Sequence, residues 1–118
     1  MNDDLTKQVI ATIASGASLS NAIDLEGYTK IAIEMPLGWT TANITLQASK
    51  ELAGQYKDVY ADEGTEISIT GTAGKFLTLG TAIKTGLGAL RFIKLRSGTT
   101  GSAVNQVAAR EIIVHLKK

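Results

Sequence analysis

Cysteine is absent from the 118-residue chain, which excludes a disulfide framework and a thiolate metal site. His115 is the only histidine, and no carboxylates are spaced to complete a zinc site with it. A Ser-His-Asp triad would have to use the same histidine, yet no serine stands in a glycine-flanked elbow. Phosphate-binding motifs of the GxxxxGK[ST] and GxGxxG types do not occur. We therefore expect no enzymatic activity, no metal and no cofactor.

The sequence also lacks the signals of export and membrane insertion. The first residues, MNDDLTKQV, carry acids where a secretory signal carries a basic and then an apolar run. No apolar stretch approaches the length needed to cross a bilayer. We expect a protein that stays soluble and folds in the cytoplasm where it is made. The glycosylation sequon that begins at Asn43 is then a coincidence.

Aromatic residues make up only 5% of the chain and the net charge is +1, so nucleic acid is not an expected partner. The charges are nevertheless divided unevenly. Residues 1–66 hold ten acids and four bases, and residues 67–118 hold one acid and eight bases. One interpretation, which we favour, is that strands from the two halves mix these charges in one fold. The alternative is two faces of opposite sign that promote contacts between subunits.

What the chain has in abundance is the pattern of β-strands. Apolar and polar residues alternate in short segments separated by glycine-containing turns, with Pro36 as the single proline. We predict one all-β domain over residues 1–118, an antiparallel β-sandwich of jelly-roll type with eight or nine strands. Residues 1–6 are expected to be a loose arm, and residues 81–89 a long loop with one helical turn at 82–84. The strands are expected at 8–14, around Leu19, Ile23 and Leu25, and at 30–35, 42–49, 56–60, 65–70, 75–80, 90–97 and 110–117.

Aromatic residues supply the first candidates for partner contacts. Trp39, in the loop "PLGWTT", has three interpretations: a plug at the end of the sandwich, a protein contact, or a platform for a sugar ring. Tyr56 and Tyr60 share one face of a strand, either as core residues with exposed hydroxyls or as interface residues.

Acidic residues are concentrated near one turn, at Asp58, Asp62, Glu63 and Glu66. Oxygen-rich loops of this kind hold calcium in some sandwiches. Their spacing fits no EF-hand, so we favour a solvated turn over an ion site.

The segment 90–110, "LRFIKLRSGTTGSAVNQVAAR", contains the remaining candidates. Alternation directs Ile93 and Leu95 into the core and Lys94 and Arg96 outward. Asn105 and Gln106 follow a loop of small residues. Their amides can satisfy backbone groups where that loop returns to the sheet, which is the interpretation we favour. The alternative is that the loop and its cations contact a neighbouring subunit.

Several of these motifs together resemble small structural proteins encoded by tailed bacteriophages. The resemblance covers residues 38–114, through "GWTTANITLQAS", "YKDVYADEGTEISI", "GKFLTL" and the segment just described, including Val104, Asn105, Gln106 and Arg110. It implies a virion component without enzymatic activity, most specifically a capsid decoration (cement) protein. The partners implied are the major capsid protein or other virion subunits and copies of the chain itself, as a trimer.

The stretch Phe92-Ile93-Lys94-Leu95-Arg96 is also similar to a late strand of discoidin-like jelly rolls. With Trp39, this similarity supports an alternative function as a carbohydrate-binding module. A tail or fibre adaptor domain is a further alternative.

Overall fold

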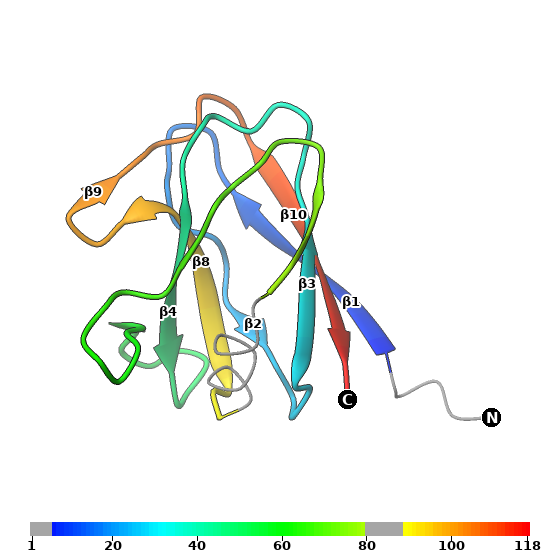
Figure 1. Ribbon diagram of the computed structural model, residues 1–118, viewed down its shortest axis with the longest axis vertical. Coiled ribbons are helices and arrows are strands. Elements are labelled where there is room, and N and C mark those ends of the chain that lie inside the picture. The colour runs from blue at the N-terminus through cyan, green and yellow to red at the C-terminus, as the bar shows by residue number, and fades with distance from the viewer. Residues whose placement is uncertain (1–5, 80–88) are drawn as a thin grey trace.

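A computed structural model describes residues 6–79 and 89–118, and these residues form two antiparallel β-sheets packed face to face (Figure 1). The described part contains no helix, so none in it could span a membrane. The helical turn expected at 82–84 and nearly all of the expected N-terminal arm lie outside the described residues. The strands are β1 (Thr6–Ile13), β2 (Ile23–Asp24), β3 (Lys30–Glu34), β4 (Ile44–Ser49), β5 (Lys57–Asp58), β6 (Ser68–Ile69), β7 (Phe76–Thr78), β8 (Phe92–Thr99), β9 (Ser102–Ala103) and β10 (Arg110–Lys117).

The first sheet has the order β1-β10-β3-β7, and the second has β2-β8-β4-β5, with β6 also paired to β4 and β9 to β8. The predicted all-β antiparallel sandwich is thus confirmed. The finer jelly-roll assignment stays a prediction, which the alternation of β1, β2, β3 and β4 between the two sheets supports.

Period-two alternation explains which side chains fill the space between the sheets. In β10, Ile112, Val114 and Leu116 are at most 2% exposed, while the intervening residues face away from the core. The central strands of the second sheet contribute in the same way. The most deeply buried apolar side chains are Ala11, Ile13, Leu25, Ile33, Ile44, Leu46, Ile112 and Val114.

The topology also brings together the two halves of the sequence. Strand β10 lies between β1 and β3, and β8 lies between β2 and β4. Basic residues of the second half therefore meet acids of the first, as in the Arg91–Asp24 pair at 2.6 Å and the Arg96–Asp58 pair at 2.8 Å. The interpretation that the charges mix within one fold is confirmed by these pairs.

The sequence analysis misplaced the end of β8. The strand was expected to stop at residue 97, because "SGTTG" has the composition of a loop, but it continues to Thr99 and turns back into β9. The turn depends on Gly98, whose φ is +96° and where a Cβ atom would lie 2.5 Å from the Ser102 carbonyl oxygen. Glycine here marks a bent strand and not its end.

Candidate protein-contact surfaces

Gln106 is the fully buried residue that fixes the loop between β9 and β10. Its Nε2 donates to the Thr40 carbonyl at 3.0 Å and to Ser97 Oγ at 2.8 Å, and its Oε1 accepts the Thr40 backbone N–H at 2.8 Å. The Gln106 backbone bonds to a third loop, donating to Ala17 at 2.9 Å and accepting from Gly16 at 2.7 Å. The predicted bracing role is confirmed for Gln106, because its side-chain amide satisfies both the N–H and the carbonyl of Thr40 in a neighbouring loop.

Arg110, at the start of β10, extends this brace. Its Nε donates to Gln106 Oε1 at 3.1 Å and its Nη2 to Thr40 Oγ1 at 3.4 Å. The guanidinium also covers Gly38, where a Cβ atom would lie 2.6 Å from Arg110 Nη1. The loop between β3 and β4 is therefore held from two sides by polar side chains of the chain's last segment.

The braced loops present apolar side chains to solvent. Leu37 is 88% exposed and Val107 is 76% exposed. Asn105, Ala108 and Ala109 are also exposed in the loop that contains Val107. We call residues 36–41 and 104–109 the loop end; Figure 1 shows these two loops together at one end of the sandwich. Exposed apolar groups on a rigid frame are typical of protein-contact surfaces.

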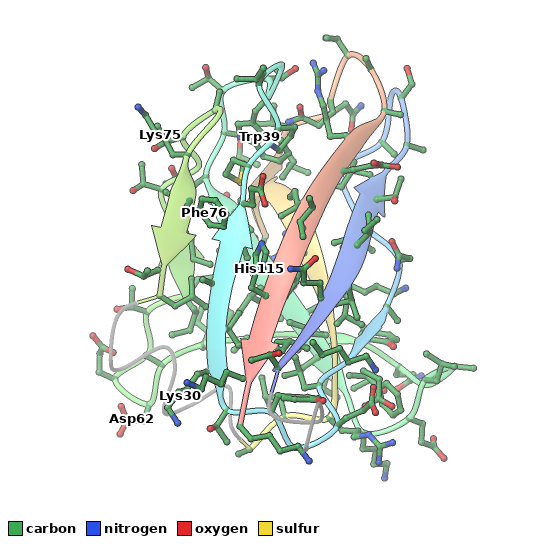
Figure 2. The ribbon with its side chains drawn as sticks, turned by 90° about the vertical axis from the view of Figure 1, so that its right-hand side faces the viewer. Lys30, Trp39, Asp62, Lys75, Phe76 and His115 are labelled. Atoms are coloured by element: carbon green, nitrogen blue, oxygen red, sulfur yellow. The ribbon has the colours of Figure 1, made fainter. Side chains whose placement is uncertain are left out.

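Trp39 is part of the loop end, but its side chain is turned inward and is only 6% exposed. Its Nε1 donates to the Ala42 carbonyl at 3.1 Å, and it belongs to the main apolar cluster. Figure 2 shows Trp39 at the upper end of the sandwich. Trp39 is thus the plug. The interpretations of Trp39 as a platform for a sugar ring or as a surface contact are wrong, because a ring enclosed in this way offers no free face.

Tyr56 and Tyr60 do not enter the core, because Val59 between them is the residue that packs against it. The core interpretation of the two tyrosines is therefore wrong. Tyr56 is half-buried, its hydroxyl donates to the Leu52 carbonyl at 2.8 Å, and burial raises its pKa. Lys94 Nζ lies 4.4 Å from the centre of the Tyr56 ring, and Tyr60 is 51% exposed. Their role as partner contacts stays a prediction.

Arg96 was expected to project into solvent, but it is 7% exposed and held by two acids. It donates from Nη1 to Asp58 at 2.8 Å and from Nη2 to Glu66 at 2.7 Å. Its Nε donates to Thr45 Oγ1 at 2.9 Å and its Nη2 also to Thr100 Oγ1 at 2.8 Å. The residue lies on the outer side of β8, as alternation requires, but the chain around β5 and β6 covers it.

This arrangement also explains the acidic cluster. Asp58 and Glu66 face the Arg96 guanidinium, whose hydrogen bond lowers the pKa of Asp58, while Asp62 and Glu63 lie in an exposed turn. Within the described residues, no three His, Asp or Glu side chains are grouped to hold a metal ion. Two of the four acids, Asp58 and Glu66, thus belong to an internal ion-pair network.

Sequence reasoning missed the apolar residues that the structure exposes. Leu37 and Val107 were not singled out from the sequence. Phe76 is 63% exposed and Ile10 is 49% exposed, both on the outer side of the first sheet. A signal was available in "KFLTL", where the alternation that buries Leu79 directs Phe76 to the opposite face.

Comparison with known proteins adds one structural likeness. No protein family and no curated protein matches the sequence. Among solved structures, the crystal structure of the SPBc2 prophage-derived protein YomS is similar over 100% of this chain and 99% of that one, with a TM-score of 0.50 and 7% sequence identity. At this identity the likeness concerns the fold, which the two proteins share from end to end.

Proposed function

We propose that the protein is a structural component of a tailed-bacteriophage particle, most specifically a decoration protein that binds the major capsid protein without catalysis. The resemblance of residues 38–114 to phage structural proteins supports this. So does the fold shared with a prophage-derived protein over its full length. The observation that carries the proposal is the loop end, where a buried glutamine and an arginine hold exposed apolar residues in place.

The loop end suits such a role for a physical reason. A loop that is already ordered loses little conformational entropy when it binds, so more of the interaction energy appears as affinity. Burial of Leu37 and Val107 against a capsid subunit would supply the apolar centre of the contact, and Asn105 its polar rim. A sandwich that contacts two adjacent subunits in this way would stabilise the shell.

The carbohydrate-binding alternative loses its main support, because Trp39 is buried. A tail or fibre adaptor would use the same kind of contact, and it differs from a decoration protein in its place on the particle.

The proposal is tested by co-sedimentation of purified protein with intact particles and empty shells of its own phage. We expect saturable binding to shells, and immunogold labelling of heads and not of tails. Leu37→Asp and Val107→Asp should abolish binding. Leu52→Asp is the matched control, because Leu52 is 60% exposed but lies outside the loop end. Absence of the wild-type protein from both particles and shells would refute the proposal, and labelling confined to tails would refute its capsid part.

A further inference from the structure

The outer face of the first sheet carries an ordered sequence of side chains that the proposed function does not use. Along β10 the residues that point away from the core are Glu111, Ile113, His115 and Lys117, so the face runs from an acid through an apolar residue and a histidine to a base. Figure 2 views this face directly, with β7, β3, β10 and β1 side by side, His115 near its centre and Lys30 towards its lower end.

Of the neighbouring strands, β3 repeats the change from acid to base, with Glu34 at one end, Ala32 in the middle and Lys30 at the other, whereas the outward residues of β1 and β7 are uncharged. At the level of Ile113, strand pairing places Ile10 on one side and Glu34 on the other, and Phe76 beyond Glu34. Ile10 and Phe76 are 49% and 63% exposed, and we call Ile10, Ile113 and Phe76 the apolar band, which Glu34 interrupts between Ile113 and Phe76. The His115 ring contacts Phe76, with 5.2 Å between ring centroids, and His115 Nε2 lies 3.2 Å from Glu34 Oε1.

The two ends of the face differ in charge. Glu111 and Glu34 lie on the side of the loop end. At the opposite end Lys117 is paired directly across the sheet with Lys30. Like charges directly opposite each other on neighbouring strands are destabilising. Lys30 Nζ donates to the Lys118 backbone oxygen at 3.1 Å, and within the described residues no Asp or Glu side chain is paired with Lys30 or Lys117.

A shallow groove lies between these ends. Its floor is Ala32, which pairs with His115 on one side and Thr78 on the other. Lys30 and Lys117 form the nearby rim. The small side chain of Ala32 thus leaves space beside His115, Lys30 and Lys117. A carboxylate of another molecule would be accommodated in this space.

We propose that two copies of the chain pack face to face through this outer face of the first sheet and are related by a two-fold axis. The axis lies in the plane between the two copies and runs perpendicular to the strands. Such an axis places β10 over β10 of the second copy and reverses its direction. Glu111 then faces Lys117 of the partner subunit, and Glu34 lies over the groove beside Lys30 of the partner subunit. The charges of the surface are complementary to themselves, as a two-fold interface requires. The same register sets Ile113 over His115 of the partner subunit, so the two apolar bands lie next to each other on either side of the axis. An axis parallel to the strands would instead place lysines over lysines.

Area and edge protection agree with a weak pair of this kind. With strands about 4.8 Å apart and about 3.4 Å per residue, the 24 residues of β1, β10, β3 and β7 present roughly 390 Å² per copy, an area typical of weak, transient contacts and not of stable interfaces. At the edge of the sheet, Asn21 Oδ1 accepts the Thr12 backbone N–H of β1 at 2.7 Å. This capping disfavours pairing through the strand edge. We therefore expect a dimer that dissociates on dilution, whether or not the protein belongs to a virion.

Sedimentation velocity over a roughly hundredfold concentration range tests the proposal. The expected limits are 12.4 kDa and twice that mass, whereas the resemblance to phage structural proteins favours three times 12.4 kDa. Phe76→Ser should shift the equilibrium to the monomer without unfolding the protein, since Phe76 is exposed. A monomer at every concentration, or a trimer unaffected by Phe76→Ser, would overturn the proposal.

Charge reversals supply a sharper test, because each exchange occurs twice in a two-fold interface. Glu111→Lys alone and Lys117→Glu alone should each raise the dissociation constant about tenfold, since two ion pairs become repulsive contacts. The double variant, or an equimolar mixture of the two single variants, should regain wild-type affinity. Glu51→Lys makes the same charge change on an exposed residue away from the face and should have no effect. Equal effects of Glu51→Lys and Glu111→Lys, or no recovery in the mixture, would overturn the geometry.

Discussion

Replacement of Arg96 by methionine tests whether the buried ion-pair network holds the region around β5 and β6 onto the sandwich. The Arg96 side chain is 8% exposed and bonds to Asp58 and Glu66, whose side chains are 29% and 15% exposed. Methionine retains much of the apolar stem but leaves both carboxylates without their cation. Removal of one partner from a buried pair costs about 3–5 kcal/mol, and we take the lower value, about 3 kcal/mol, because both acids keep some contact with water.

The expected change is large enough to measure by thermal unfolding. At an unfolding entropy of about 2.1 cal/mol/K per residue, 118 residues correspond to about 4 °C in Tm per kcal/mol, so Arg96→Met should lower Tm by about 12 °C. Arg91→Met is the matched control. Arg91 also bonds an aspartate, Asp24, at 2.6 Å, but its side chain is 58% exposed, and such pairs contribute at most about 1 kcal/mol. Similar Tm losses in the two variants would refute the argument from burial.

The dependence of Tm on pH in the acid range provides an independent check of this network. The hydrogen bond from Arg96 lowers the pKa of Asp58 in the folded protein, so this carboxylate contributes stability above its unfolded pKa of about 3.9. That contribution is lost as the pH falls through the folded pKa. Arg96→Met removes the guanidinium that lowers the pKa of Asp58, so the variant lacks this contribution at every pH. The difference in Tm between wild type and variant should therefore narrow as the pH is lowered from about 6 towards 3. A constant or widening difference would contradict this assignment.

Two further substitutions examine the loop end and its support. Leucine is close to glutamine in size, but Gln106→Leu leaves the N–H and the carbonyl of Thr40 without partners. The free energy of unfolding, measured in urea, should fall by about 2–3 kcal/mol. Asn105→Ala, on the exposed neighbour, should change it by less than about 0.5 kcal/mol. Gly71→Ala should destabilise the protein by at least about 1 kcal/mol, because its Cβ would lie 2.3 Å from the Ala42 carbonyl oxygen, while Gly101→Ala, with no atom within 4 Å, should be neutral. Equal unfolding midpoints within either pair would contradict the contacts described.

The sequence predicted the sheets better than the surfaces, and the reason is physical. Strands such as β3 and β10 are visible because burial of one face imposes alternation on consecutive residues. The position of Arg96 is not visible in this way, since alternation says which side of the sheet a residue faces but not which distant segment covers it. Its partners lie 30 and 38 residues away in sequence.

The candidate site residues also differ in how far the sequence alone predicts their roles. Gln106 was correctly interpreted as a brace, because an amide beside a returning loop has an evident use, although its partner Thr40 could not have been named from the sequence. Trp39 was left open among three roles, since a tryptophan in a Gly-Thr loop is compatible with burial and with exposure. Only the position of the Ala42 carbonyl and the surrounding core decides for burial.

The two proposed surfaces make a joint prediction, because the geometry relates them. The loop end lies beyond the last residue of β3 and before the first of β10, at the end of the sheet where Glu111 stands. A two-fold axis perpendicular to the strands reverses their direction, so the two loop ends of a dimer point away from each other. One shell surface can then engage only one of them, and dimerisation adds no avidity on the shell. Phe76→Ser, which should abolish the dimer, is therefore expected to bind shells with wild-type affinity and stoichiometry. A parallel loss of dimerisation and shell binding would mean instead that the outer face, and not the loop end, contacts the capsid.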